Sequence, residues 1–103
     1  MKKLTFNEID YQVDERFENY AVFKLPSSNV DFCGYFPEEG KDTQNFFVQF
    51  KNGGTYLYKD VPTETIKKAP LADSIGKFVR AEISAHFPST KLDHSIVTPL
   101  NLT

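Results

Sequence analysis

The turn Asn52-Gly53-Gly54 is the feature of this sequence that most constrains its fold, because it separates two segments with the alternation of β-strands. Asparagine and glycine tolerate the positive φ angles of a tight hairpin turn. The segment before the turn, 45–51, places Phe46, Val48 and Phe50 on one face and Phe47, Gln49 and Lys51 on the other. Residues 55–59 then form the returning strand. The sequence therefore predicts an antiparallel hairpin.

A third strand is predicted just before this hairpin. Residues 29–36 alternate so that one face carries Val30, Phe32 and Phe36 and the other carries Asp31, Cys33 and Tyr35. This pattern is typical of a half-buried strand. Residues 37–42, which include a proline and a glycine, form the connecting loop. We therefore expect three consecutive antiparallel strands.

Two helices should follow the hairpin. Residues 63–69 form a short helix after Pro62, because a first helical turn tolerates proline. A second helix begins near Asp73 or Ser74, either of which can serve as its N-cap, and runs to about His86. Its apolar stripe consists of Ile75, Phe78, Val79, Ile83 and Phe87. These elements predict an α+β domain, with an antiparallel β-sheet of three to five strands and two helices packed on one face.

The two ends of the chain are compatible with more than one structure. Residues 20–25 have the pattern of a strand, whereas the apolar residues at 6, 9, 11 and 13 fit neither the helical nor the strand period. For residues 6–13 we favour a strand over a short helix. Residues 92–103 either pack as an extended arm or are disordered.

Composition limits the class of protein. The chain has 103 residues, of which 40% are hydrophobic and 25% charged, as in a single globular domain. The one cysteine, Cys33, cannot form an intramolecular disulfide, and the N-terminal lysines are not followed by the apolar stretch of a signal peptide. The sequence contains no run of about 18 apolar residues, the length needed to span a membrane. We therefore expect a cytoplasmic protein that does not enter a membrane.

Charge is distributed unevenly along the chain, although the net charge is only −2. Residues 1–50 contain nine acidic and five basic residues, whereas residues 51–91 contain four acidic and seven basic residues. The small net charge excludes an overall cationic field that would attract nucleic acids or membranes. The second segment instead predicts a local basic surface, formed by Lys59, Lys67, Lys68, Lys77 and Arg80.

A series of short motifs in the centre of the chain resembles one known family. The motifs are Ser-Ser-Asn-Val at 27–30, Gly34-Tyr35, Phe47-Val-Gln-Phe-Lys-Asn-Gly53, Tyr56-Leu-Tyr58, Val61-Pro62, Ala72-Asp-Ser74-Ile-Gly76-Lys-Phe78 and Ile83. In their order and spacing they are similar to the KTSC domain. That module is named for its occurrence at the C-terminus of some lysyl-tRNA synthetases and is also found as a free-standing bacterial or phage protein. We therefore divide the single domain 1–103 into a module at about 26–92, an N-terminal extension at 1–25 and a C-terminal arm at 93–103.

The resemblance implies little about function. RNA binding has been suggested for the family because the module is attached to a synthetase, and no catalytic residues come with it. Family members tend to end the second helix with a basic, aromatic segment. Residues 82–88 of this chain are neutral to acidic, which counts against RNA binding.

The returning strand contains one candidate site. Tyr56 and Tyr58 point the same way, near Phe47 and between Lys51 and Lys59. Aromatic rings flanked by cations hold single-stranded nucleic acid on a sheet face. The alternative is that both tyrosines belong to the core, with their hydroxyl groups at its edge. The choice depends on which face of the sheet the helices cover.

The start of the second helix is another candidate site, because Ser74, Gly76 and Lys77 could bind an anion there. The alternative is structural, with Ser74 as the N-cap and Gly76 allowing the helix to approach the sheet closely. The full set of candidate nucleic-acid-binding or anion-binding residues is Lys51, Tyr56, Tyr58, Lys59, Lys67, Lys68, Ser74, Gly76, Lys77 and Arg80.

No motif indicates catalysis. His86 and His94 are too few, and too far from carboxylate partners, to predict a metal site. Cys33 lies in the middle of a predicted strand, where we expect a buried small hydrophobic residue rather than a nucleophile. We therefore expect a protein without catalytic residues, metal or cofactor.

Two functions fit these features. The first is a small non-enzymatic module that binds RNA or single-stranded nucleic acid through the local basic surface. The alternative is an accessory or inhibitory factor of phage or mobile-element type, which binds a protein partner through the two extensions. It is suggested by apolar residues that need a place to pack, namely Phe6, Ile9, Phe17, Ile96 and Leu100. In either case we expect a monomer or a small homo-oligomer.

Overall fold

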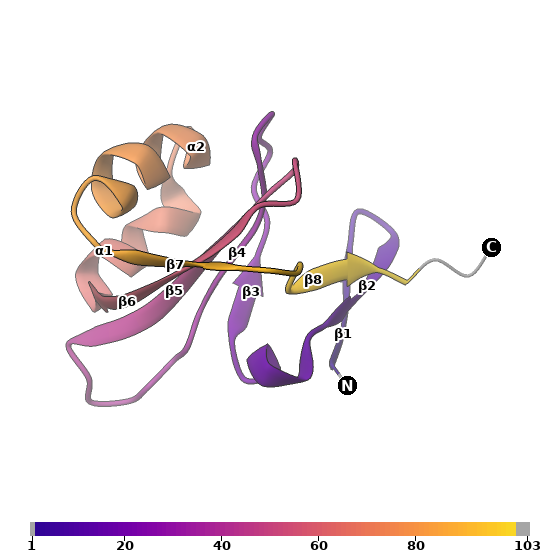
Figure 1. The fold of residues 1–103 in the computed structure, drawn as a ribbon, viewed down its shortest axis with the longest axis horizontal. Helices are drawn as coiled ribbons and strands as arrows, with labels where there is room; N and C mark the ends of the chain where they lie inside the picture. Colours follow the sequence, from indigo (N-terminus) through magenta and orange to yellow (C-terminus); the bar gives the residue numbers. More distant parts are fainter. Residues whose placement is uncertain (1, 101–103) are drawn as a thin grey trace.

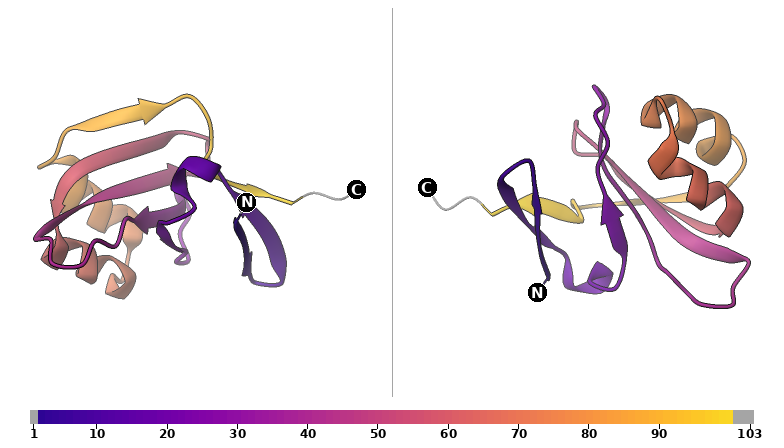
Figure 2. Two further views of the ribbon diagram at one scale, coloured as in Figure 1. Left: turned by 90° about the horizontal axis from the view of Figure 1, so that it is seen from below. Right: turned by 180° about the vertical axis from the view of Figure 1, so that it is seen from behind.

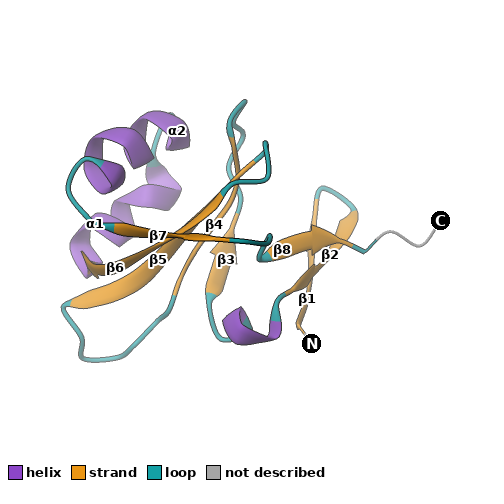
Figure 3. Ribbon diagram, in the orientation of Figure 1, coloured by secondary structure: helices purple, strands orange, loops and turns teal. Residues whose placement is uncertain are grey.

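A computed structural model describes residues 2–100 of the chain. Its strands are β1 (Lys2–Phe6), β2 (Ile9–Val13), β3 (Ala21–Phe23), β4 (Val30–Tyr35), β5 (Thr43–Phe50), β6 (Thr55–Pro62), β7 (Ser89–Leu92) and β8 (Val97–Pro99). Its helical segments are the 3₁₀ turn η1 (Glu15–Phe17), α1 (Thr63–Lys68), the 3₁₀ turn η2 (Ala69–Leu71), α2 (Ile75–Phe78) and its π-helical continuation η3 (Val79–Ser84). Figure 1 labels the main elements, and Figure 3 distinguishes helices from strands.

Five strands form a central antiparallel sheet in the order β3-β4-β5-β6-β7. The helices α1 and α2–η3 lie together on one face of this sheet (Figure 1). The predicted α+β class is therefore confirmed. The core on the helix-covered face consists of Val30, Cys33, Phe46, Val48, Tyr58, Val61, Ile66, Ala69, Ile75, Val79 and Ile83.

The β5–β6 hairpin has the predicted geometry. Gly53 has a φ angle of 95°, which glycine adopts without the steric penalty of a side chain. At the base of the turn, the Phe50 N–H donates to the Gly54 carbonyl over 2.7 Å. Phe46 packs beneath the helices and Phe47 packs on the opposite face, as the alternation predicts.

Strand β4 differs from the prediction at its start. The register with β5 shifts between Val30 and Phe32, as in a β-bulge, so that Val30 lies on the helix-covered face with Cys33. Phe32 lies on the opposite face. The predicted common face for Val30 and Phe32 is therefore wrong. Cys33 is buried as expected, and burial raises the pKa of its thiol to about 12.

Both predicted helices are present. Helix α1 starts directly after Pro62, and the Ser74 hydroxyl caps α2 by accepting a hydrogen bond from the Lys77 backbone N–H over 3.3 Å. The α-helical turns of α2 continue as the π-helical segment η3. Strand β7, which the sequence pattern does not predict, pairs antiparallel with β6 at the edge of the central sheet.

A second sheet is built from the two ends of the chain in the order β1-β2-β8. Residues 6–13 are not the single strand we favoured, because Asn7 and Glu8 form a turn between β1 and β2 with φ angles of 51° and 67°. This turn explains why the apolar residues fit no single period. Strand β8 pairs with β2, so the C-terminal arm is extended as far as Leu100. Residues 101–103 of the arm lie outside the described part of the chain.

The second sheet and η1 cover the face of the central sheet that the helices leave open (Figure 2). The core on this side consists of Tyr11, Val13, Phe17, Tyr20, Phe32, Phe47, Ile96 and Val97. Phe6 packs edge-on against Phe32, with 5.5 Å between the ring centroids. Most apolar residues of the extensions therefore pack within the chain, whereas Ile9 is 50% exposed.

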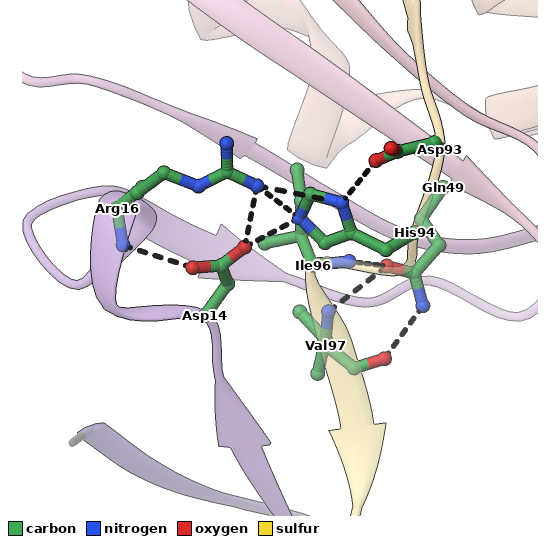
Figure 4. A network of polar contacts seen from close by, with 7 residues as sticks. All are labelled: Asp14, Arg16, Gln49, Asp93, His94, Ile96 and Val97. Carbon is green, nitrogen blue, oxygen red and sulfur yellow. Dashed lines mark hydrogen bonds and ion pairs between the residues drawn. The ribbon is translucent and has the colours of Figure 1, made fainter.

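Gln49 joins the two sheets. Its side chain is 3% exposed and projects from β5 toward the second sheet (Figure 4). The Oε1 atom accepts hydrogen bonds from the backbone N–H groups of Ile96 and Val97 over 2.8 and 2.9 Å, and Nε2 donates to the Val97 carbonyl over 2.7 Å. Leaving such a buried group unpaired would cost about 1–3 kcal/mol. Gln49 therefore fixes the position of the C-terminal arm.

A charged network holds the start of the same arm (Figure 4). His94 Nε2 lies 2.5 Å from Asp14 Oδ2, and His94 Nδ1 lies 2.7 Å from Asp93 Oδ1. Arg16 Nη2 donates to Asp14 Oδ2 over 3.1 Å and also contacts the His94 ring. The hydrogen bonds with Asp93 and Asp14 raise the pKa of His94. Burial acts to raise the pKa of Asp14, but hydrogen bonds from Arg16 and His94 outweigh it and lower this pKa to about 2.

Two glycines differ in what surrounds them. A Cβ atom on Gly34 in β4 would lie 2.3 Å from a ring carbon of Phe47, which is fully buried. A Cβ atom on Gly76 in α2 would meet only the Ser27 Oγ, at 4.0 Å. Gly34 thus permits the close approach of Phe47. The expected role of Gly76 in bringing the helix close to the sheet is wrong, because space for a side chain is present.

Stability should depend on pH through His94. Its pKa is raised in the folded chain, so its stabilising contribution is complete below the unfolded value of about 6.5 and is lost as pH rises through the folded value. We expect the free energy of unfolding to fall over this interval in urea titrations from pH 5 to 9. The variant His94→Gln should lack this decrease. An equal decrease in the variant would show that another group is responsible.

The two glycines predict opposite responses to alanine. Gly34→Ala should lower the free energy of unfolding by about 1–3 kcal/mol, because the new methyl group overlaps Phe47. Gly76→Ala should be neutral or raise it by up to about 1 kcal/mol, because alanine is the better helix former. Urea denaturation of both variants tests this difference. A loss at Gly76 as large as that at Gly34 would restore the close-approach explanation.

Candidate nucleic-acid interface

The structure separates the ten predicted site residues into distinct groups. Tyr58 is 4% exposed within the core beneath the helices, so its ring is not accessible for stacking on a base. Tyr56 lies on the same face but is only half-buried. Phe47 is fully buried on the opposite face. The predicted stacking surface of Tyr56, Tyr58 and Phe47 is therefore wrong, and the core alternative describes Tyr58.

Three of the predicted cations lie away from the hairpin turn. Lys59 follows Tyr58 in β6, so it faces away from the helices. Lys67 and Lys68 are exposed at the end of α1. Helix α1 starts at the far end of β6, where the Thr63 N–H donates to the Asp42 carbonyl over 2.8 Å. These lysines therefore do not form one surface with the β5–β6 turn.

The start of α2 is closer to the turn. The Ser27 hydroxyl accepts hydrogen bonds from the Asn29 and Val30 N–H groups over 3.1 and 3.0 Å, and the same oxygen is the neighbour of Gly76. The adjoining loop also contacts the turn, since the Lys51 N–H donates to the Asn29 carbonyl over 2.8 Å. Lys77 and Arg80 are exposed on the outer side of the helix.

Four hollows surround the β5–β6 turn and share lining residues. Those on either side of Phe50 and Asn52 have volumes of about 460 and 360 Å³, and Lys51 lines the first of them. A hollow of about 450 Å³ continues from Lys51 toward Phe6 and Lys24, and one of about 560 Å³ continues from Asn52 toward Lys91. We call this feature the hairpin-end groove, defined by Phe50, Lys51, Asn52, Gly54, Tyr56 and Lys91.

Two neighbouring aromatic rings lie between two cations in the groove. The rings of Phe50 and Tyr56 make an edge-to-face contact with 5.9 Å between their centroids. Lys91 lies directly across from Tyr56 in the β6–β7 pair. Lys51 and Lys91 are exposed, and neither has an ion-pair partner among the residues that the structure describes. In contrast, Lys24 is paired with Asp31 over 2.8 Å. The groove thus offers two cations without ion-pair partners among the described residues beside partly accessible rings, and Asp93 lines the same hollow as Lys91.

The sequence predicted two members of this groove and missed others. Lys51 and Tyr56 were both candidates, whereas Lys91 was not, because β7 was not recognised as a strand. Phe50 was placed on the same strand face as Phe46 and Val48, and this face is the one the helices cover. Its position next to the turn leaves it half-buried. Lys51, directly before the Asn-Gly turn, was the available local signal.

The described residues lack the arrangements required for a metal site, for base catalysis by His94 and for a membrane-spanning helix. Within residues 2–100, no three His, Cys, Asp or Glu side chains gather in a group that could hold a metal ion. Both ring nitrogens of His94 face carboxylates, so this histidine has no free nitrogen to act as a base. None of the helices in this part of the chain is long and apolar enough to cross a membrane.

Comparison with known proteins identifies the family. The KTSC domain model matches residues 26–87. A protein from Tsukamurella paurometabola is 35% identical over 68 residues, which cover 66% of this chain and 96% of that protein. The crystal structure of a KTSC domain protein from Yersinia pestis superposes with a TM-score of 0.61 at 29% identity, covering 71% of this chain and 97% of that one. The chain described here therefore belongs to the KTSC domain family.

Proposed function

We propose that this protein is a non-enzymatic module that binds single-stranded nucleic acid, RNA in particular, in the cytoplasm. The hairpin-end groove is the proposed binding surface. The observation that carries the proposal is the pairing of half-buried aromatic rings with exposed lysines that have no ion-pair partner among the described residues, around one exposed turn. Bases stack on partly accessible rings, and neighbouring cations neutralise the phosphates between them.

The composition of the groove sets the expected mode of binding. Phe50 and Tyr56 offer ring edges and faces without a fixed set of hydrogen-bonding side chains, so every base can be accepted. Lys51 and Lys91 are exposed point charges suited to phosphate oxygens. Binding should therefore depend weakly on sequence and strongly on salt concentration.

The helix surface is the natural comparison within the same chain. Lys67, Lys68, Lys77 and Arg80 are also exposed, but they share the helices with Glu64, Asp73 and Glu82. These acids reduce the local positive charge. None of the described hollows is lined by a residue of α1 or α2. The groove therefore combines features that the helix surface lacks.

The alternative of a protein-binding factor loses the observation that suggested it. Phe6, Phe17 and Ile96 pack against the central sheet of the same chain. Only Ile9 among the apolar residues that prompted the idea is 50% exposed. A partner is therefore not required to cover these residues, and nucleic-acid binding is the function that we propose.

A salt titration with charge variants tests the proposal. The probe is a fluorescein-labelled oligouridylate of about twelve nucleotides, measured by fluorescence anisotropy from 50 to 200 mM salt. Neutralising two phosphate contacts should contribute about 1.4 to the slope of log affinity against log salt. The double variant Lys51→Gln, Lys91→Gln should bind more weakly and lose this part of the slope.

The matched control removes the same charge elsewhere. Lys67→Gln, Lys68→Gln should retain binding within about twofold, because these lysines lie outside the groove. Equal losses in the two double variants would reject the groove as the binding surface. An absence of binding by the unmodified chain at 50 mM salt would reject the function itself.

A further inference from the structure

The C-terminal arm occupies a strand-binding site on the face of the central sheet opposite the helices. Its floor includes Phe47 and Leu57, and Gln49 provides both a hydrogen-bond donor and an acceptor in the middle of it. The exposed edge of β2 forms one side, since Gln12 pairs with Thr98 and Val13 with Val97. An extended segment is therefore bound both by sheet pairing and by a side-chain amide. We call this site the arm groove.

The hydrogen bonds that hold the arm in place are independent of β7, the strand that leads into it. The arm pairs with β2, and its backbone bonds run from Asp14 N–H to the Ile96 carbonyl over 2.8 Å and from Leu100 N–H to the Asp10 carbonyl over 2.9 Å. Gln49, in β5, provides the remaining hydrogen bonds. None of these contacts involves β7. An arm that arrives from another copy of the chain can make the same contacts.

A second observation concerns the residue next to Gln49. Thr55 in β6 pairs with Gln49 in register and is fully buried, and its Oγ1 is the buried side-chain atom without a hydrogen-bond partner among the described residues. Thr55 also pairs with Leu92, the last residue of β7. The arm must therefore turn from beside Thr55 to above Gln49 within residues 93–95. This short connection brings the arm to Gln49, and the buried Thr55 hydroxyl beneath it has no partner among the described residues.

We infer that the arm groove is a binding site for the C-terminal arm of a second copy of this chain. In a single copy the groove is filled by the chain's own arm. When two copies exchange arms, residues 93–95 act as the hinge and each arm fills the other copy's groove. Such an exchange preserves every hydrogen bond between the arm and Gln49.

Residues 93–95 are the tether between β7 and the arm. The length of this tether decides whether the closed monomer or the arm-exchanged dimer is populated. A short tether gives an effective concentration in the millimolar range, so the closed single copy should predominate at micromolar concentrations. Without residues 93–95, Leu92 and Ile96 would be joined by one peptide unit of about 3.8 Å. Strands β7 and β5 are two strand spacings apart, or roughly 10 Å. An arm shortened in this way cannot reach its own groove and can be seated only in another copy.

Deletion of residues 93–95 in the otherwise full chain tests the inference. We expect a shift from monomer to dimer in sedimentation velocity at about 10 μM, with the Ile96 and Val97 amides still protected from hydrogen exchange. Adding Gln49→Ala to the deletion should return the chain to a monomer. A deleted chain that remains a monomer with unprotected arm amides would overturn the inference.

The matched control keeps the length of the tether and removes the charged network around His94. The triple variant Asp93→Gly, His94→Ser, Ser95→Gly should remain a monomer, because its tether can still reach. A dimer here would mean that loss of the His94 network, rather than tether length, causes association. If the deleted chain does not fold, the unmodified chain refolded from urea decides: a dimer fraction at least tenfold higher at 1 mM than at 10 μM is expected, and no such increase overturns the inference.

Discussion

A buried glutamine amide joins the two sheets of this protein. Gln49 lies among apolar side chains, where its amide requires hydrogen-bond partners, and the backbone of Ile96 and Val97 provides them. The arm in turn pairs with β2, which pairs with β1. The second sheet is therefore attached through the Gln49 amide, supported by the His94 network and by apolar packing. Loss of this amide would weaken the attachment of all three strands.

The same strands connect this contact with the proposed binding surface. Strand β5 carries Gln49 and leads two residues later into Lys51 at the turn. Strand β7 contributes Lys91 to the hairpin-end groove and then leads into the arm. The family-matched region, residues 26–87, contains β5 and β6 but neither β7 nor the arm. The groove and the second sheet thus depend on segments that lie beyond the matched region.

The extent to which sequence predicted the structure varies with the range of the interactions. The β5–β6 hairpin was predictable because Gly53 and the alternation of neighbouring residues are local signals. The bulge at Val30 was not, because an extra residue in one strand changes the face without changing the pattern. The turn at Asn7 and Glu8 lacks glycine and proline, so it was overlooked. The role of Gln49 depends on an arm 47 residues away in sequence, which no local pattern reveals.

Hydrogen exchange at the arm tests the central claim, that the Gln49 amide holds the second sheet on the first. In the unmodified chain the Ile96 and Val97 amides donate to Gln49 and should exchange slowly. In Gln49→Ala, both amides should exchange at least tenfold faster, while the Val48 amide in the centre of the sheet keeps its protection. Unchanged protection of Ile96 and Val97 in this variant would contradict the account, because the arm would then be held without the amide.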